Sequence, residues 1–327
     1  MIRPFGGEPP FQDRVPHLYT TDSGRSSLRL ILEDPCFSTK RYLLPDYLCG
    51  TVLEVLDQYG VVYDFYAIGD GLRWDPEEIN RAKYDVLYAI DYFGWKQDLS
   101  AIALKPGSVL LEDGVFLPYL EPPDRWPHWI GFNSLRKISP LPDGSMVWST
   151  VPLVGKKMEG PASFVSLKVR GQRKKAAFLA GCGGCEKDYL ADLQHGETLL
   201  NRQQSIHAPS SVAVGRMMDF YRKLEVEYSV RRAQFAVYEQ ALGRFVDRDA
   251  PEYPCFYPLL LEDRDAVRAA LALQQIYLPA HWPELEGVRG EVQRRMLALP
   301  LDGRFSASEV QRLVEILVRM DLQGAAV

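Results

Sequence analysis

Hydrophobic and polar positions alternate between two periods along the first half of the chain. Apolar residues recur at helical spacing over 26–33 and 51–59, and Asp75 begins a third helix as an N-cap followed by a proline and two acidic residues. Short apolar or β-branched runs predict strands at 41–44, 61–68, 84–90, 108–111 and 129–132. Because helices and buried strands alternate, we predict an α/β fold whose sheet is mostly parallel and covered by helices.

The pattern changes after residue 150. A basic, glycine-containing stretch is followed by a long helical region over 210–242, whose apolar stripe is explained by core or interface packing. A strand over 257–261, a helix over 262–273 and a helix from Ser306, with Glu309 at capping-box spacing, complete the chain. We predict a large α/β domain over 1–205 and a smaller C-terminal domain over 206–327 that begins with the long helix.

Composition narrows the class of protein. The chain has 327 residues, 46% apolar and 25% charged, which is typical of a soluble globular protein with two domains. The net charge of −5 and the lack of a long basic stripe disfavour nucleic acid as a partner, and we expect Lys168–Lys175 to be a solvated basic loop. No signal-peptide pattern or 18-residue apolar run occurs, so we expect a cytoplasmic protein with no membrane partner.

The cysteines do not predict a disulfide framework or a metal site. Five cysteines are scattered along the chain, and only Cys182 and Cys185 are closely spaced. That pair could be half of a zinc site or a redox pair, but no second pair lies at ligand spacing. We prefer a plain glycine-rich turn and predict no metal.

Two charged residues stand at predicted strand ends and suggest cofactor chemistry. Asp113 ends the run 108–111, and Lys137 follows the run 129–132. Sites in open α/β sheets gather at the carboxyl ends of strands. Pyridoxal phosphate needs a lysine amine to hold its aldehyde as a Schiff base and a carboxylate to keep its pyridine nitrogen protonated. The alternative is two unrelated charged residues.

A candidate phosphate anchor opens the first predicted helix, at Ser23–Ser27. Glycine allows close backbone approach, the helix N-terminus offers free N–H groups, and serine and arginine add donors. A neutral N-cap explains this segment equally well.

Several segments together resemble the DegT/DnrJ/EryC1/StrS family, the sugar aminotransferases of pyridoxal-phosphate fold type I. The similar segments are 23–28, 44–49, 91–98, 111–113, 134–137, 142–144, 263–265, 276–283 and 301–305. They occur in the family's order and span nearly the whole chain.

The resemblance implies roles for individual residues. Lys137 would form the Schiff base, as an internal aldimine, and Asp113 would contact the pyridine nitrogen. The other residues implied to bind the cofactor are Gly24, Arg25, Ser26 and Ser134 around its phosphate and Tyr47 against its ring.

The chain also departs from the family pattern. Phe116 stands where the family commonly has a glutamine or a histidine, and Asp91 stands where it has a histidine. Phe132 replaces a serine. We expect His281–Pro283 to be a structural turn rather than part of the substrate pocket. His207 and Ser210 lie where family members send residues toward the neighbouring subunit, although we favour a local role for them.

The resemblance implies an enzyme that transfers an amino group to a keto-sugar. A lysine at 137 favours transamination, since the dehydratase branch has histidine there. The implied substrate is nucleotide-linked, for polysaccharide or secondary-metabolite assembly, with glutamate as donor, and the implied assembly is a homodimer. Two alternatives are a pyridoxal-phosphate enzyme with a non-sugar substrate and an inactive binding or regulatory homologue.

Overall fold

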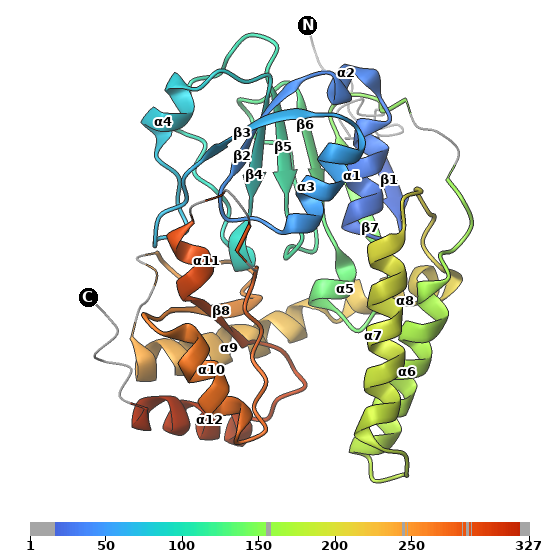
Figure 1. Cartoon of the computed structure of the whole chain (residues 1–327), viewed down its shortest axis with the longest axis vertical. Coiled ribbons are helices and arrows are strands. Elements are labelled where there is room, and N and C mark those ends of the chain that lie inside the picture. The colour runs from blue at the N-terminus through green and yellow to red at the C-terminus, as the bar shows by residue number, and fades with distance from the viewer. Residues whose placement is uncertain are drawn as a thin grey trace, which may run out of the picture.

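A seven-stranded sheet forms the N-terminal part of the molecule (Figure 1). The computed structural model describes residues 17–154, 158–243, 246, 248–282, 284–285, 288 and 290–320. The strands are β1 (His17–Thr21), β2 (Arg41–Pro45), β3 (Val62–Tyr66), β4 (Val86–Ile90), β5 (Val109–Asp113), β6 (Trp129–Phe132) and β7 (Ser145–Ser149). Their order is β1-β7-β6-β5-β4-β2-β3, and only β7 runs antiparallel to its neighbours, so the prediction of a mostly parallel sheet is confirmed.

The central strands are apolar because both faces of the sheet are covered. Every residue of β4 and β5 is buried, which explains why these strands are continuous hydrophobic runs rather than alternating ones. The connecting helices are α1 (Gly24–Leu32), α2 (Pro35–Ser38), α3 (Gly50–Gln58), α4 (Pro76–Arg81), the 3-10 helix η1 (Tyr92–Gly94) and α5 (Leu135–Ile138). Asp75 caps α4 by accepting a hydrogen bond from the Glu77 N–H, as the sequence predicts.

A helical hairpin follows the sheet and corrects one prediction. Helices α6 (Phe164–Leu179) and α7 (Glu186–Arg202) lie side by side, beside the C-terminal part of the chain (Figure 1). The segment Lys168–Lys175 therefore lies inside α6, and the prediction of a basic loop is wrong. Three of its cations face α7 and pair with carboxylates there: Arg170 and Lys174 with Asp192, and Lys168 with Glu197.

The turn between these helices contains the two closely spaced cysteines. Cys182 and Cys185 are exposed free thiols, and the intervening Gly183 and Gly184 have positive φ angles of 100° and 85°. A left-handed backbone of this kind favours glycine, so the predicted glycine-rich turn is confirmed.

The predicted long helix is two helices. Helix α8 (Ser211–Arg222) begins at the N-cap Ser210 and ends at Lys223, where α9 (Leu224–Leu242) starts. The chain continues through β8 (Phe256–Leu260), α10 (Arg264–Ala272), α11 (Glu291–Arg295), β9 (Met296–Pro300) and α12 (Ala307–Arg319). Strands β8 and β9 pair antiparallel in a second sheet, and Ser306 and Glu309 form the predicted capping box of α12.

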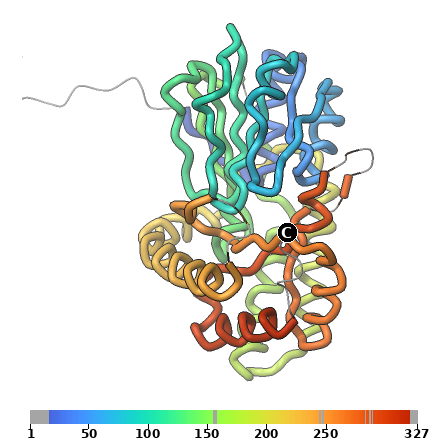
Figure 2. The backbone as a smooth tube through the Cα atoms, turned by 90° about the vertical axis from the view of Figure 1, so that its left-hand side faces the viewer, coloured from blue at the N-terminus to red at the C-terminus, as the bar shows by residue number. Residues whose placement is uncertain are grey.

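The chain from α9 onward, coloured gold to red, lies mostly below the N-terminal part that contains the large sheet (Figure 2). The division at residues 205 and 206 stays a prediction. Within the described residues, no helix combines the length and apolar character needed to cross a lipid bilayer.

Candidate active site

A cavity of about 70 Å³ lies at the carboxyl ends of β5 and β6. Its walls come from the starts of α1 and α3, from the segments that follow β5 and β6, from α7, and from the C-terminal half of the chain. The lining residues are Ser23, Gly24, Arg25, Leu28, Cys49, Thr51, Val52, Asp113, Val115, Phe132, Ser134, Arg136, Lys137, Leu200 and Trp282. Five residues predicted from the sequence therefore share one cavity: Gly24, Arg25, Asp113, Ser134 and Lys137.

Asp113 is the last residue of β5 and points an acid into this cavity. Its side chain is 4% exposed, accepts a hydrogen bond of 2.7 Å from the Tyr88 hydroxyl, and accepts a second of 3.2 Å from the Val115 N–H. Burial raises the pKa of Asp113 to about 6, although both hydrogen bonds and the Lys137 amine act in the opposite direction. A further cation against this carboxylate would favour its ionised form.

Lys137 reaches the same cavity from α5, just after β6. Burial lowers the pKa of the Lys137 amine, and the neighbouring Arg136 lowers that pKa further. The ring centroid of Phe116 lies 5.5 Å from Nζ, and among the described residues the amine has no hydrogen-bond partner. A lysine of this kind keeps more of its neutral, nucleophilic form at neutral pH.

The opposite wall can receive an anion. Ser23 caps α1 by accepting a hydrogen bond from the Ser26 N–H, and Gly24 and Arg25 follow at the positive end of the helix. Burial lowers the pKa of Arg25, and the guanidinium of Arg136 lowers it further. Two cations that disfavour each other at one cavity would be compensated by a bound anion.

The two guanidinium groups are held by α7. Arg25 donates a hydrogen bond of 2.8 Å to the Asn201 side chain, and Arg136 donates one of 2.9 Å to the Glu197 carboxylate. Lys168 of α6 also pairs with Glu197. The hairpin therefore orients the cationic wall of the cavity.

Two of the predicted residues do not line the cavity. Ser26 is fully buried behind the start of α1, where its hydroxyl accepts a hydrogen bond of 3.0 Å from the Gln203 amide. Tyr47 is also fully buried, stacks on Tyr92 at 5.1 Å between ring centroids, and donates a hydrogen bond to the His281 carbonyl. Cys49, two residues further on, is the residue of this segment that lines the cavity.

Sequence reasoning gave no role in the cavity to several lining residues, among them Cys49, Arg136, Leu200 and Trp282. Arg136 could have been found from its position beside Lys137. Cys49 follows a β-strand in a loop that has no period, and Leu200 belongs to α7, which was not predicted. Nothing in the local sequence pointed to either of them.

The position of Trp282 corrects the interpretation of the segment 281–283 as a structural turn outside the pocket. Its ring lines the cavity and stacks on Phe116 at 6.2 Å between centroids. His281 lies 5.8 Å from the same ring, and burial, with a smaller contribution from Lys137, lowers its pKa to about 3. His281 is therefore neutral at physiological pH. Pro283 lies outside the described residues.

The remaining residues singled out in the sequence have partners elsewhere. Asp91 is buried beside Glu112, and burial followed by this like charge raises the pKa of Asp91 well above its usual range. The Ser210 hydroxyl donates a hydrogen bond of 2.6 Å to Asp143, and His207 Nδ1 donates one of 2.7 Å to the Gly160 carbonyl.

Comparison with known proteins gives similar structures but no similar sequences. No protein-family profile matches the chain, and no curated protein matches its sequence. A DegT DnrJ EryC1 StrS aminotransferase from Brucella abortus has a similar structure, with a TM-score of 0.61, 14% identity, and coverage of 94% of this chain and 86% of that one. The chain has the fold of this protein.

Two further solved structures are similar to this chain over most of its length. DesV of S. venezuelae, solved with a ketimine intermediate, has a TM-score of 0.65 and 14% identity over 94% of this chain and 85% of its own. PseC of Helicobacter pylori, an aminotransferase of pseudoaminic acid biosynthesis, has a TM-score of 0.63 and 13% identity over 93% and 86%. The prediction of the fold type I architecture of DegT/DnrJ/EryC1/StrS aminotransferases is confirmed, and at these identities the likeness establishes the fold alone.

The donor set of the cavity in this aminotransferase fold fits pyridoxal phosphate. Asp113 offers a buried carboxylate whose raised pKa a pyridinium cation would lower, and Lys137 offers an amine with no partner among the described residues. The start of α1, with Arg25 and Arg136, offers positive charge for a phosphate. These three groups match the three polar ends of the cofactor.

Proposed function

We propose that this protein is a pyridoxal-phosphate-dependent aminotransferase that transfers an amino group to a keto-sugar. The observation that carries the proposal is the meeting of the Lys137 amine, the Asp113 carboxylate and the cationic start of α1 in one cavity. Each group alone has a structural explanation, but together in one cavity they suit a ligand with an amine-reactive, a cationic and an anionic part.

The residues that would hold the cofactor are divided by charge. Gly24, Arg25 and Arg136 would bind the phosphate, with Ser134 as a further donor, and Asp113 would face the pyridine nitrogen. When bound, pyridoxal phosphate supplies an aldehyde that condenses with amines and a ring that withdraws electrons from the substrate carbon. Ser26 and Tyr47 would support this wall from behind, because both are buried outside the cavity.

Lys137 would move the proton. Because burial and Arg136 lower the pKa of its amine, Nζ can accept a proton from a substrate carbon and return it to another atom of the same bound molecule. Asp113 stays ionised beside a cationic ring, as its two hydrogen-bond donors also favour. Trp282 and Leu200 cover apolar walls and limit the entry of water.

The substrate proposal rests on similar structures. One of these is DesI in the presence of its TDP-sugar product, and another is the sugar aminotransferase CalS13 from Micromonospora echinospora. By analogy we assign a nucleotide-linked keto-sugar as acceptor and glutamate as donor.

We also propose a homodimer. Helix α8 buries only Ala213 in the chain itself and leaves Val214 and Met218 54% and 62% exposed. Exposed apolar residues one turn apart on a helix, such as these two, suit a subunit interface.

The test is a half-reaction. Purified protein titrated with pyridoxal phosphate should gain a visible absorbance band, and glutamate should then shift this band, whereas Lys137→Ala should give neither change. A nucleotide-linked keto-sugar should restore the band and yield an amino sugar detected by mass spectrometry. Absence of the band refutes the cofactor assignment, and a band that responds to glutamate but to no keto-sugar refutes the acceptor.

A further inference from the structure

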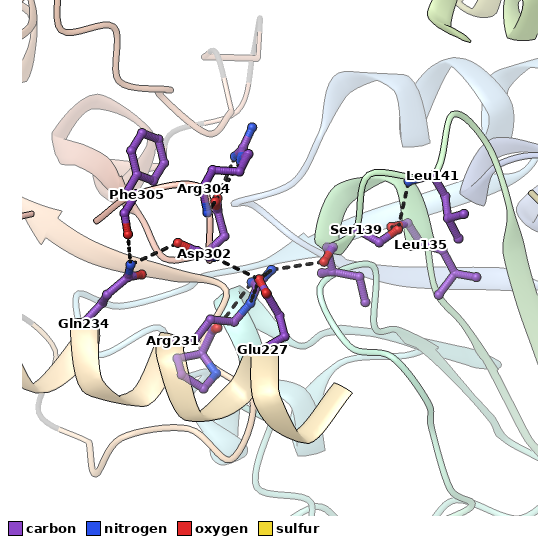
Figure 3. A network of polar contacts seen from close by, with 12 residues as sticks. Leu135, Ser139, Leu141, Glu227, Arg231, Gln234, Asp302, Arg304 and Phe305 are labelled. Carbon is purple, nitrogen blue, oxygen red and sulfur yellow. Dashed lines mark hydrogen bonds and ion pairs between the residues drawn. The ribbon is translucent and has the colours of Figure 1, made fainter. Parts of the chain in front are cut away.

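Three polar side chains lie along one face of α9, at Glu227, Arg231 and Gln234 (Figure 3). Their spacing of four and three residues places them one above another on the helix. Arg231 is 6% exposed and Gln234 is also 6% exposed, which is unusual for such side chains and requires partners. Arg231 contacts the end of α5, and Gln234 contacts the loop after β9.

Arg231 joins α9 to the segment that contains Lys137. Its Nη2 donates a hydrogen bond of 3.0 Å to the Ile138 carbonyl, and its Nη1 donates one of 3.5 Å to the Pro254 carbonyl. Its charge is balanced by Glu227, whose carboxylate accepts a hydrogen bond of 3.1 Å from Nε. A guanidinium suits this position because its donors are fixed in one plane and reach several acceptors at once.

The two carbonyls belong to residues that adjoin the cofactor lysine in space. Ile138 directly follows Lys137, and Pro254 directly precedes Cys255, whose buried thiol interacts electrostatically with the Lys137 amine. Helix α5 has only four residues, and a helix of one turn has little stability of its own. The backbone beside Lys137 therefore depends on contacts from outside the helix.

The other end of this brace is anchored in the C-terminal part. The Gln234 amide donates hydrogen bonds to the Asp302 and Phe305 carbonyls at 3.0 and 3.1 Å (Figure 3). Glu227 also accepts a hydrogen bond of 3.4 Å from the Gly303 N–H. Arg231 thus lies between a fixed loop after β9 and the end of α5.

We propose that Arg231 is a positioning residue that holds Lys137 at the cavity through the Ile138 carbonyl. The role of Lys137 as the cofactor-binding lysine rests on the function proposed above. Arg231 acts through the backbone rather than through charge, since the largest influences on the pKa of Lys137 are burial and Arg136, and Arg231 is not among the main ones. Its removal should release the amine toward water rather than change the charges around it.

The environment of the amine defines the readout. The charged and titratable groups that face Lys137 from the surrounding elements are Arg136, Asp113, Cys49, Cys255 and His281. An Arg231 variant keeps all five groups, and of these only Cys255, whose thiol pairs with the Arg231 guanidinium, loses a partner. A change in the pH at which Lys137 reacts would therefore report movement of the amine out of its buried position.

The experiment uses apoprotein and a small acylating reagent, with modification of Lys137 followed by mass spectrometry across a pH series. In Arg231→Met the midpoint should move up by about one pH unit, because burial no longer lowers the pKa of the amine. Arg231→Lys keeps one donor and should give a smaller shift. The matched control is Gln234→Ala, which loosens the same helix from the same loop but has no contact with α5, and its midpoint should equal that of the wild type.

A second readout uses the cofactor. When borohydride is used to fix pyridoxal phosphate on Lys137, half-maximal labelling should need at least about tenfold more cofactor in Arg231→Met than in Gln234→Ala. Equal midpoints and equal labelling in these two variants would overturn the proposal. Failure of the wild type to bind cofactor would refute the proposed function, and the apoprotein midpoints would still decide the role of Arg231. If Arg231→Met does not fold, Arg231→Lys alone decides it by the same comparison.

Discussion

Replacement of Asp113 by asparagine should stabilise the apoprotein and weaken its cofactor binding. The carboxylate is 4% exposed, and burial raises its pKa from 3.8 to about 6. A folded-state pKa above that of the unfolded chain means that ionisation opposes folding. Asparagine has nearly the same shape and no charge, so it removes this cost while it also removes the partner of a pyridinium nitrogen.

The magnitude follows from the shift. A rise from 3.8 to about 6 corresponds to about 3 kcal/mol at 1.36 kcal/mol per unit, which is an upper limit because the Tyr88 hydroxyl must accommodate an amide. The sign depends on pH. Above pH 6 the wild type carries the whole cost, and as the pH falls from 6 toward 4 the folded carboxyl is protonated first and the cost disappears. The gain in Asp113→Asn should therefore be largest at pH 7–8 and small at pH 4.

Urea unfolding of both apoproteins at pH 8 and pH 4 measures this difference, because titrating groups that do not interact with Asp113 contribute equally in the two proteins. Pyridoxal phosphate should then stabilise the wild type and have a much smaller effect on Asp113→Asn. A stability difference that is equal at the two pH values, or a variant less stable than the wild type at pH 8, would refute the assigned electrostatics of Asp113.

Three further outcomes are expected. Gly94→Ala should lower the free energy of unfolding by more than about 3 kcal/mol, because Gly94 has a φ of 109° and an added Cβ would lie 2.0 Å from the Tyr253 carbonyl oxygen. Gly107→Ala, at a φ of 73° with open space around it, should lower it by only about 1 kcal/mol, and thermal unfolding measures both. Asp192→Asn should destabilise the protein above pH 4 and less in acid, since Arg170 and then Lys174 lower the pKa of this carboxylate; equal losses across pH would contradict this. Arg25→Met should weaken cofactor binding about tenfold while Lys137 is still labelled, and an unchanged affinity would remove Arg25 from the phosphate site.

Much of the fold could be predicted because its signals are local. The strand β5 is a continuous apolar run, α4 has an aspartate cap with a proline behind it, and α12 has a capping box. Asp113 and Lys137 stood out for a similar reason, since Asp113 ends β5, Lys137 lies five residues after the end of β6, and the carboxyl ends of these two parallel strands meet at one edge of the sheet.

The remaining features depend on tertiary contacts. The cations of 168–175 look solvated in sequence, but the segment is part of α6, and Lys168, Arg170 and Lys174 pair with carboxylates of α7. Tyr47 and Cys49 lie in one loop, where Tyr47 packs on Tyr92 and Cys49 lines the cavity, and the sequence alone does not distinguish these two orientations. Leu200 and Trp282 reach the cavity from segments distant in sequence; the pattern around Leu200 did not point to the cavity, and that around Trp282 was interpreted as a structural turn.

The central claim is that Lys137 is the residue to which the cofactor is bound. The most direct measurement is borohydride reduction of the protein after incubation with pyridoxal phosphate, followed by peptide mass spectrometry. We predict one stoichiometric addition, on the peptide that contains Lys137, and none in Lys137→Ala. A protein that takes up no label, or one labelled elsewhere with Lys137 unmodified, would contradict the account.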